Sequence, residues 1–405
     1  MSNCIIAQSG GPTSVINSSV VGVLKANNEL KKYDNVYAGL NGIEGILNEN
    51  IINLSSMSDE EINLFKYTPS SGLGSCRYKM KPLEDSTEEY DKLLSILKKL
   101  DISTFFYVGG NDSMDTTAKL RLYAKKNSLD INIIGIPKTI DNDLMYTDHT
   151  PGFASAAKFI ATTVLETYLD SSVYINNGIF IIETMGRDAG WLTASACMAK
   201  YNGKPVADFI YLPEAAFDIN TFLKDVEKKF KEQNQVYIVV SEGIRTKDGK
   251  FLSEMEASSH DNFGHSQLGG VGNYLKQLII EAGITNRVKS LELGVLQRCA
   301  MHCASQVDID EAFNAGYEAL KNVSKENNGC MVYINRISNS PYTVSYEFVD
   351  ATKVANHVKY FPSEWINKSG NHIDEKAYDY FRPLLKGTPE LCTFDSIPKY
   401  KIFTK

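Results

Sequence analysis

Short apolar runs alternate with longer amphipathic stretches along most of the chain. The short runs are continuously apolar, and several stop at glycine or proline, which predicts buried β-strands. The predicted strands are Cys4–Ala7, Thr104–Val108, Ile131–Ile136, Gly178–Glu183, Phe209–Leu212 and Val236–Ser241. The longer stretches repeat apolar residues every three or four positions, which predicts helices with one buried face. The predicted helices are Ser14–Leu24, Tyr90–Leu100, Ser113–Lys125, Phe153–Leu169, Asp188–Lys200, Ile219–Phe230, Leu275–Ala282 and Ile309–Val323.

This alternation predicts an α/β fold in which βαβ units build mostly parallel sheets. Two later segments, Met331–Ile334 and Tyr342–Val349, alternate more and predict an antiparallel addition. From Lys368 onward the chain is polar and irregular, so we expect a tail on the surface. The length of 405 residues indicates two or three domains, or two large lobes, at about 150 residues per domain.

Composition narrows the classes of function. A net charge of −7 and a pI near 5.5 argue against a nucleic-acid partner, which needs a basic surface. The first residues reach the turn at Gly10-Gly11 without a long apolar core, so we expect no signal peptide. The sequence contains no apolar run of about 18 residues, so we expect no membrane span. The seven cysteines are odd in number and lack Cys-x-x-Cys spacing, which predicts reduced thiols in the cytoplasm.

The candidate chemistry gathers where predicted strands end. In open parallel sheets, ligands bind beyond the carboxyl ends of the strands. Five of these ends carry glycine-rich or charged sequences, and this clustering is the strongest indication of a functional site. They are Gly10–Ser14 (GGPTS), Gly109–Ser113 (GGNDS), Pro137–Asp143 (PKTIDND), Glu183–Arg187 (ETMGR) and Ser241–Gly243 (SEG).

Two of these loops hold paired glycines between a strand and a helix. Gly10-Gly11 and Gly109-Gly110 let backbone N–H groups approach a ligand, and the helix N-terminus adds partial positive charge. A plain chain turn explains either pair alone, but their repetition in equivalent positions favours phosphate binding. Neither loop is a P-loop or a dinucleotide-binding fingerprint.

The loop after the third predicted strand combines Lys138 and Thr139 with two carboxylates, Asp141 and Asp143. In an extended segment these carboxylates would face the same side. Transfer of a phosphoryl group to a hydroxyl needs a carboxylate to accept the proton and cations to cover the phosphate charge. The structural alternative is an Asp-rich turn held by its own hydrogen bonds.

Arg187 and Glu242 follow two further apolar strands. A guanidinium suits a phosphate, and a carboxylate accepts hydrogen bonds from sugar hydroxyls. Either residue alone is more often a solvated charge, so only their neighbours give them weight. Cys299, His302 and Cys303 look like a metal cluster, but they stand beside alanines in an expected buried helix, so we interpret them as structural.

Together these loops resemble the 6-phosphofructokinase family. The resemblance runs from about residue 4 to about residue 325, and the order TIDND, MGR, QR makes it specific. The sequences that carry it are GGPTSVIN, GSCRYK, GGNDS, PKTIDNDL, TPGFASAAK, ETMGR, SEG and LGVLQR. It implies two similar Rossmann-like lobes with the site between them, a homodimer or homotetramer, and transfer of a phosphoryl group to the 1-hydroxyl of fructose 6-phosphate with Mg²⁺.

The resemblance also implies roles for individual residues. Asp141 would be the general base and Arg77 would stabilise the transferring group, with Mg²⁺ at Asn111 and Asp143. Asparagine replaces the usual aspartate at this first metal position. The implied donor-binding residues are Gly10, Gly11, Gly110, Asp112 and Lys138. The implied sugar-phosphate residues are Thr139, Ile140, Asp141, Met185, Gly186, Arg187, Glu242 and Arg298.

Two positions depart from the pattern of ATP-using members. Those members typically read GGDGS and PGTIDND, whereas this chain has Asp112 and Lys138 in place of the variable glycines. Both changes resemble the pyrophosphate-dependent branch and make these two residues catalytic candidates. Gly178 stands where ATP users have an arginine that reaches the sugar 6-phosphate of a neighbouring subunit, and Arg287 and Lys289 are the candidates to replace its charge.

The sequence thus predicts a donor lobe at 1–145, completed by a segment near 295–330, a sugar-phosphate lobe at 146–295, and C-terminal strands with a tail at 330–405. Pyrophosphate-dependent phosphofructokinase is the leading hypothesis, with pyrophosphate and fructose 6-phosphate as partners. An ATP-dependent phosphofructokinase and a catalytically inactive sugar-phosphate sensor are the alternatives. A dinucleotide-binding oxidoreductase would rest on the βα alternation alone.

Overall fold

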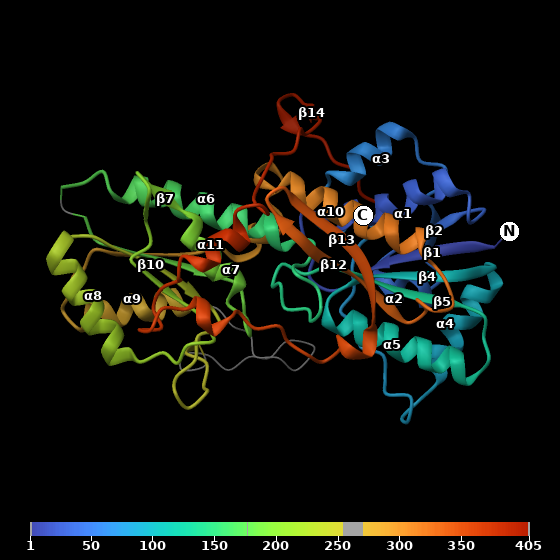
Figure 1. Ribbon diagram of the computed structural model, residues 1–405, viewed down its shortest axis with the longest axis horizontal. Helices are drawn as coiled ribbons and strands as arrows, with labels where there is room; N and C mark the ends of the chain where they lie inside the picture. The colour runs from blue at the N-terminus through green and yellow to red at the C-terminus, as the bar shows by residue number, and fades with distance from the viewer. Residues whose placement is uncertain (1, 176, 254–269, 404–405) are drawn as a thin grey trace.

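The computed structural model describes residues 2–175, 177–253 and 270–403. Two sheets with their helices form two lobes that lie side by side along the long axis of the molecule (Figure 1). The expected α/β fold with mostly parallel sheets is confirmed.

The larger lobe is built on a seven-stranded sheet in the order β13-β12-β5-β4-β1-β2-β3. The central strands are parallel, β3 joins one edge antiparallel to β2, and β13 pairs antiparallel with β12 at the other. Its strands are β1 (Asn3–Gln8), β2 (Val36–Gly39), β3 (Ile51–Asn53), β4 (Ile102–Gly109), β5 (Asn132–Pro137), β12 (Cys330–Asn339) and β13 (Tyr342–Asp350). Its helices are α1 (Ile16–Leu30), α2 (Gly42–Leu47), α3 (Asp59–Lys66), α4 (Glu88–Lys99), α5 (Asn111–Lys126) and α10 (Gln306–Lys321).

The smaller lobe has a four-stranded parallel sheet in the order β11-β6-β10-β9. Its strands are β6 (Ile179–Thr184), β9 (Phe209–Tyr211), β10 (Val236–Ser241) and β11 (Val288–Glu292). Its helices are α6 (Phe153–Ser171), α7 (Trp191–Ala194), α8 (Ile219–Gln233) and α9 (Val271–Glu281). A short hairpin of β7 (Lys200–Tyr201) and β8 (Lys204–Pro205) leads into β9.

The strands are apolar throughout because both faces of each sheet are covered. In β1, Cys4 and Ile6 pack against α1 and α10, whereas Ile5 and Ala7 pack on the opposite face among residues of α2 and α4. The same alternation separates neighbours in β6 of the smaller sheet. Two-sided burial is the reason that the sequence shows continuous apolar runs instead of a period of two.

The predicted helix Asp188–Lys200 is wrong in length. Only Trp191–Ala194 is α-helical, and a 3₁₀ turn at Ser195–Met198 follows it. The chain must then enter the β7–β8 hairpin, which ends the helix early. The buried helix expected around Cys299 and Cys303 is also wrong, because two 3₁₀ turns, Gly294–Arg298 and Met301–Cys303, occupy this stretch and both thiols are partly exposed.

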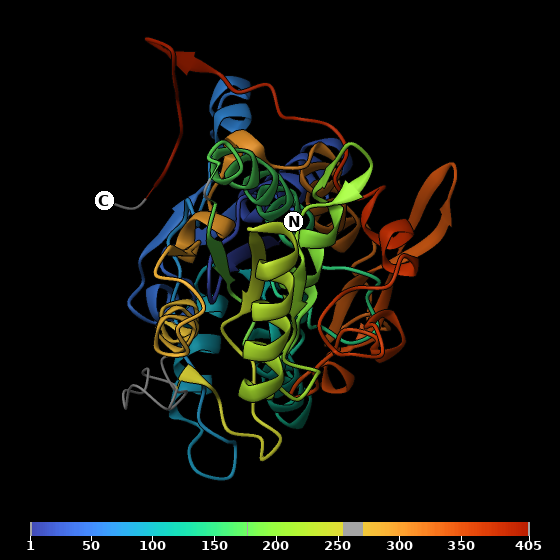
Figure 2. The same cartoon turned by 90° about the vertical axis from the view of Figure 1, so that its left-hand side faces the viewer.

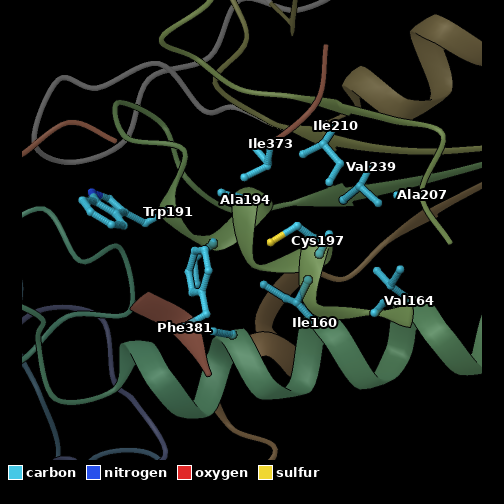
Figure 3. Packing of buried hydrophobic residues seen from close by; sticks show 14 of the residues in the cluster. Ile160, Val164, Trp191, Ala194, Cys197, Ala207, Ile210, Val239, Ile373 and Phe381 are labelled. Atoms are coloured by element: carbon cyan, nitrogen blue, oxygen red, sulfur yellow. The ribbon is translucent and has the colours of Figure 1, made fainter. Parts of the chain in front are cut away.

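The expected surface tail after Lys368 is wrong for its first part. Helix α11 (Lys376–Phe381) buries most of its side chains in the smaller lobe. Figure 3 shows Phe381 and Ile373 among Ile160, Trp191 and Ile210 of that lobe. The hairpin of β14 (Thr393–Phe394) and β15 (Ile397–Pro398) does stand away from the body (Figure 2). The chain then returns to the larger lobe, where the Phe403 ring lies 5.4 Å from the ring of Phe65. Within the described chain, no helix combines the length and the apolar character that a membrane crossing needs.

Candidate active site

The five loops singled out in the sequence follow the carboxyl ends of strands in both sheets. The glycine pairs follow β1 and β4, and the Lys138 loop follows β5, all in the larger lobe. The Met185 loop and Glu242 follow β6 and β10 of the smaller lobe. Arg187 of the smaller lobe lowers the pKa of Asp141 of the larger lobe, so the loops of the two lobes lie near each other.

Lys138 lies directly against the first glycine pair. Its ammonium is 2.6 Å from the carbonyl oxygen of Gly11, to which it donates a hydrogen bond. A Cβ at Gly10 would come within 3.4 Å of this nitrogen, and one at Gly11 within 3.1 Å of a guanidinium nitrogen of Arg298. Gly10 has a φ of 76°, which favours glycine, and the two cations lie close over the glycine pair, so the cations and the loop backbone form a cradle for an anion.

The two glycine loops differ in their relation to a helix. Gly110 is the N-cap of α5, so the helix N-terminus follows directly, as predicted. After the first pair, α1 begins only at Ile16. The first loop therefore offers its own backbone and the Lys138 ammonium, and only the second offers a helix N-terminus.

Several charges act on Lys138. Burial lowers the pKa of its ammonium to about 8, nearby Asp141 and Asp143 raise it, and Arg298 and Arg77 lower it. Two carboxylates and two guanidinium groups lie close enough to Lys138 to shift its pKa, so we place this lysine at the centre of the site. The structure thus brings Arg77 and Arg298, which are far apart in the sequence, close to Lys138.

Asp141 stands beside Lys138 and is held by Thr139. The Thr139 hydroxyl donates to the carboxylate at 3.3 Å, and the N–H of Asp141 donates to the same hydroxyl at 3.1 Å. Burial raises the pKa of Asp141, while Thr139, Lys138 and Arg187 lower it in part. A carboxylate with a raised pKa is a better proton acceptor than an exposed aspartate.

The loop that carries the two aspartates is not extended. Asn142 between them has φ of 55°, which is the left-handed region, so the geometric premise of the sequence argument is wrong. The Asn142 side chain explains this conformation, because its oxygen accepts from the N–H of Thr150 at 3.0 Å and its nitrogen donates to Tyr380 at 2.8 Å. The carboxylates still feel each other, since burial and the charge of Asp141 raise the pKa of Asp143 to about 7.

The Met185 loop turns back through Gly186, whose φ is 127°. Two side chains hold its backbone: Glu242 accepts from the N–H of Gly186 at 3.1 Å, and Gln297 accepts from the N–H of Met185 at 3.2 Å. Burial raises the pKa of Glu242 to about 7, while the Gly186 hydrogen bond and Arg187 lower it. Gly186, Arg187 and Glu242 therefore form one unit, as the sequence predicted.

Asp112 lies exposed in the first turn of α5 and makes no capping hydrogen bond, because Gly110 is the N-cap. The neighbouring Asn111 is turned toward the C-terminal segment. Its oxygen accepts from the N–H of Asn356 at 2.5 Å, and its nitrogen donates to the carbonyl of His357 at 2.6 Å.

The sequence analysis missed several residues of this site. Gln297 is 1% exposed and stands directly before Arg298 in the QR pair, so that motif could have revealed it. Asp188 lies close enough to Asp141 and Asp143 to raise both pKa values, and its carboxylate pairs with Arg245. Lys359 reaches the loop of Asp141 and Asp143 from the C-terminal segment, and no local sequence pattern identifies it.

Comparison with known proteins decides the family. The family model described as phosphofructokinase matches residues 3–323. The chain belongs to the phosphofructokinase family. The match spans the smaller sheet, strands β1 to β5 of the larger sheet and the five loops of the site. It ends before β12, so β12, β13 and the C-terminal segment lie outside it.

Relatives and a solved structure extend the likeness over nearly the whole chain. A pyrophosphate–fructose 6-phosphate 1-phosphotransferase of Halomonas elongata is 39% identical over 391 residues, which is 95% of this chain and 92% of that protein. One of Xanthomonas campestris is 40% identical over 402 residues, which is 98% of this chain and 95% of that protein. The crystal structure of a pyrophosphate-dependent phosphofructokinase from Nitrosospira multiformis matches with a TM-score of 0.88 and 35% sequence identity. The match covers 98% of this chain and 95% of that chain.

Proposed function

We propose that this protein transfers a phosphoryl group from pyrophosphate to the 1-hydroxyl of fructose 6-phosphate, giving fructose 1,6-bisphosphate and phosphate in a reversible reaction. The observation that carries the proposal is the partnership of Lys138 with Gly11, in which an ammonium occupies the donor loop. The relatives named for this reaction support it, because they match along almost the full length of the chain.

Asp141 accepts the proton of the 1-hydroxyl in this proposal. Its raised pKa and its anchoring by Thr139 suit it to that task. The hydroxyl oxygen then forms a bond to the terminal phosphorus of pyrophosphate while the bridging P–O bond breaks. The leaving group is phosphate, so no adenosine is needed.

The cations around the glycine cradle stabilise the charge of the transferring and leaving groups. Lys138 binds the leaving phosphate, Arg77 stabilises the transferring phosphoryl group, and Arg298 binds the sugar phosphate. Preorganised cations in a site shielded from water stabilise developing charge without reorganisation, which is the main source of catalysis in phosphoryl transfer. The reduced proton affinity of Lys138 leaves room for an anion to raise it again on binding.

Glu242, Arg187 and the Met185–Gly186 backbone form the sugar side. Glu242 accepts the N–H of Gly186 through one oxygen, and in this proposal the carboxylate also accepts a sugar hydroxyl. In this proposal the larger lobe holds pyrophosphate and the smaller lobe holds the sugar phosphate, so transfer occurs across the line where the lobes meet.

Mg²⁺ fits the residues present. Burial and Asp141 raise the pKa of Asp143 to about 7 although Lys359 lowers it, so the nearby cations offset the charge of the two carboxylates only in part. Mg²⁺ binds through one or two carboxylates together with substrate phosphates and waters. Asp143 would hold it, and the bound ion supplies charge neutralisation to pyrophosphate. Asn111 is the second proposed ligand; its oxygen accepts the N–H of Asn356, which leaves one lone pair for the ion.

The protein is a cytoplasmic homo-oligomer in this proposal. All seven cysteines, each of them within the described residues, are free thiols, which fits a reducing compartment. Val173, Tyr174 and Ile175 are 70%, 57% and 96% exposed, and such an apolar patch suits a subunit contact. Tyr174 lines a hollow together with Arg287 and Lys289. Sedimentation velocity distinguishes a monomer from a dimer or tetramer.

The proposed reaction is tested by ³¹P NMR of the purified protein with fructose 6-phosphate, pyrophosphate and Mg²⁺. We expect the pyrophosphate signal to disappear as a 1-phosphate ester signal and inorganic phosphate grow in equal amounts. The reverse mixture, fructose 1,6-bisphosphate with phosphate, should regenerate pyrophosphate. Hydrolysis of pyrophosphate without formation of the ester would refute transfer to the sugar.

A further inference from the structure

The C-terminal segment crosses from one lobe to the other beside the catalytic loop. Ala351, Val354 and Ala355 pack with Met114 in the larger lobe. Further along, the segment places Phe361 and Phe381 in the core of the smaller lobe. The orange-to-red ribbon in Figure 1 follows this path from β13 to α11.

Lys359 lies at the crossing and binds three oxygens of the loop that follows the catalytic aspartates. Its ammonium donates to the side-chain oxygen of Asn142 at 3.2 Å, and to the carbonyls of Thr147 at 3.0 Å and Asp148 at 2.9 Å. These three bonds use all three protons of the ammonium. They join the position between the two aspartates to the far end of the same loop.

The backbone of Lys359 is fixed at the same place. Its N–H donates to the carbonyl of Asp143 at 2.8 Å, and its own carbonyl accepts from the indole N–H of Trp191 at 3.0 Å. The Trp191 ring also lies 5.0 Å from the ammonium. Lys359 therefore contacts the catalytic loop through both side chain and backbone while it is anchored to the smaller lobe.

A second residue of the C-terminal segment completes the arrangement around Asn142. The Tyr380 hydroxyl accepts from the Asn142 amide at 2.8 Å and donates to the carbonyl of Asp148 at 2.8 Å. Asn142 adopts a left-handed conformation, which asparagine tolerates better than most L-residues. Lys359 and Tyr380 hold its side chain by hydrogen bonds.

We propose that Lys359 is a positioning residue for phosphoryl transfer, which fixes the loop carrying Asp141 and Asp143 through Asn142. This rests on the function proposed above and extends it beyond the family-matched part of the chain, which ends at residue 323. Lys359 and Asn142 are 217 residues apart in the sequence. In this proposal the C-terminal segment therefore determines the geometry of a loop that lies much earlier in the chain.

Positioning has a specific kinetic consequence. A base displaced by about 1 Å from its reacting proton loses roughly a hundredfold in rate, although the substrates still bind. Loss of Lys359 should therefore lower kcat and change both KM values much less. A merely structural role would lower the amount of folded enzyme and leave the kinetic constants of the folded fraction intact.

The test compares Lys359→Met with Lys359→Arg, Tyr380→Phe and the control Lys353→Met, an exposed lysine on the same segment. For each variant, kcat is calculated from the concentration of folded enzyme, so that a loss of folded protein does not count as a loss of rate. We expect Lys359→Met to lower kcat by about tenfold to a hundredfold with less than about threefold change in either KM. Tyr380→Phe should lower kcat in the same sense by a smaller factor, Lys359→Arg should recover part of the loss, and Lys353→Met should match the unmutated protein.

A double variant separates positioning from other roles. If Lys359 acts through the loop base, Lys359→Met should cost little further rate in an Asp141→Asn background, since the base is already gone. Equal losses in both backgrounds would overturn the proposal, and so would an unchanged kcat in Lys359→Met or, if that variant does not fold, in Tyr380→Phe. Absence of turnover in the unmutated protein would instead contradict the proposed function.

Discussion

The Arg298 guanidinium lies so close to Gly11 that a Cβ on this glycine would come within 3.1 Å of it. Arg298 belongs to the sugar-phosphate group by its motif, and Gly11 belongs to the donor loop. In the proposed function, the residues for the two substrates therefore lie beside each other at this point.

Arg298→Ala should raise the KM for fructose 6-phosphate by at least tenfold. A charge-assisted hydrogen bond contributes about 1.5–3 kcal/mol, and 1.4 kcal/mol corresponds to about tenfold in affinity. The KM for pyrophosphate should change much less. Steady-state kinetics with each substrate varied in turn checks this, with Arg382→Ala, an exposed arginine of the smaller lobe, as control. An unchanged sugar KM would remove Arg298 from that site.

Asp141→Asn should lower kcat by about 10²–10⁴-fold, the usual range for loss of a general base. Substrate binding should change little, because asparagine keeps the hydrogen bonds to Thr139. The pKa of Asp141 is raised by burial, so kcat of the unmutated protein should fall with decreasing pH at a pH above the ordinary aspartate range. Asp130→Asn, an exposed site before β5, is the matched control. A variant at position 141 with near-normal kcat would contradict the assignment.

His149 predicts how stability depends on pH. Its ring nitrogens lie 2.8 Å from Asp148 and 2.6 Å from Glu311, in a fully buried position. Burial lowers the pKa of His149, but Glu311 and Asp148 outweigh it and raise the pKa from 6.5 to about 9. This stabilisation is complete below pH 6.5 and is lost as the pH rises through 9.

The measurement is urea denaturation at several pH values in the unmutated protein and in His149→Gln. The difference in unfolding free energy between the two should shrink by up to about 3 kcal/mol as the pH rises across this window. His302→Gln, at an exposed histidine, should follow the unmutated protein at every pH. A difference that does not depend on pH would show that His149 is neutral in the native state.

Most of the fold could be predicted from the sequence because its signals are local. Strands β1, β4 and β10 are buried on both faces, so their sequences are continuously apolar, and the loops that follow them carry the site. Lys359 contacts Asn142, which lies 217 residues away, so no local pattern identifies this side chain. Gln297 contacts Met185, which lies 112 residues away, and only its place in the QR pair could have identified it. Helix α11 was missed although Ala377, Tyr378 and Phe381 have helical spacing, because the polar residues around them masked it.

Asp112 and Lys138 should together decide the phosphoryl donor. The Asp112 side chain is exposed and does not cap α5, so its carboxylate is free to repel the additional phosphate of ATP. Two anions about 4 Å apart at a dielectric near 20 repel by about 4 kcal/mol. Asp112→Gly should raise activity with ATP and lower it with pyrophosphate, and Lys138→Gly should lower the pyrophosphate rate further. Asp112→Asn separates charge from bulk, and an unchanged donor preference in Asp112→Gly would assign this residue no role in the choice.

The central claim is that pyrophosphate is the donor, and the most direct test is kcat/KM for each donor. The unmutated protein is assayed with saturating fructose 6-phosphate and Mg²⁺, with pyrophosphate or ATP varied and fructose 1,6-bisphosphate measured. We expect kcat/KM for pyrophosphate to exceed that for ATP by at least several hundredfold, the factor that corresponds to about 4 kcal/mol. Efficient turnover with ATP and none with pyrophosphate would contradict the account.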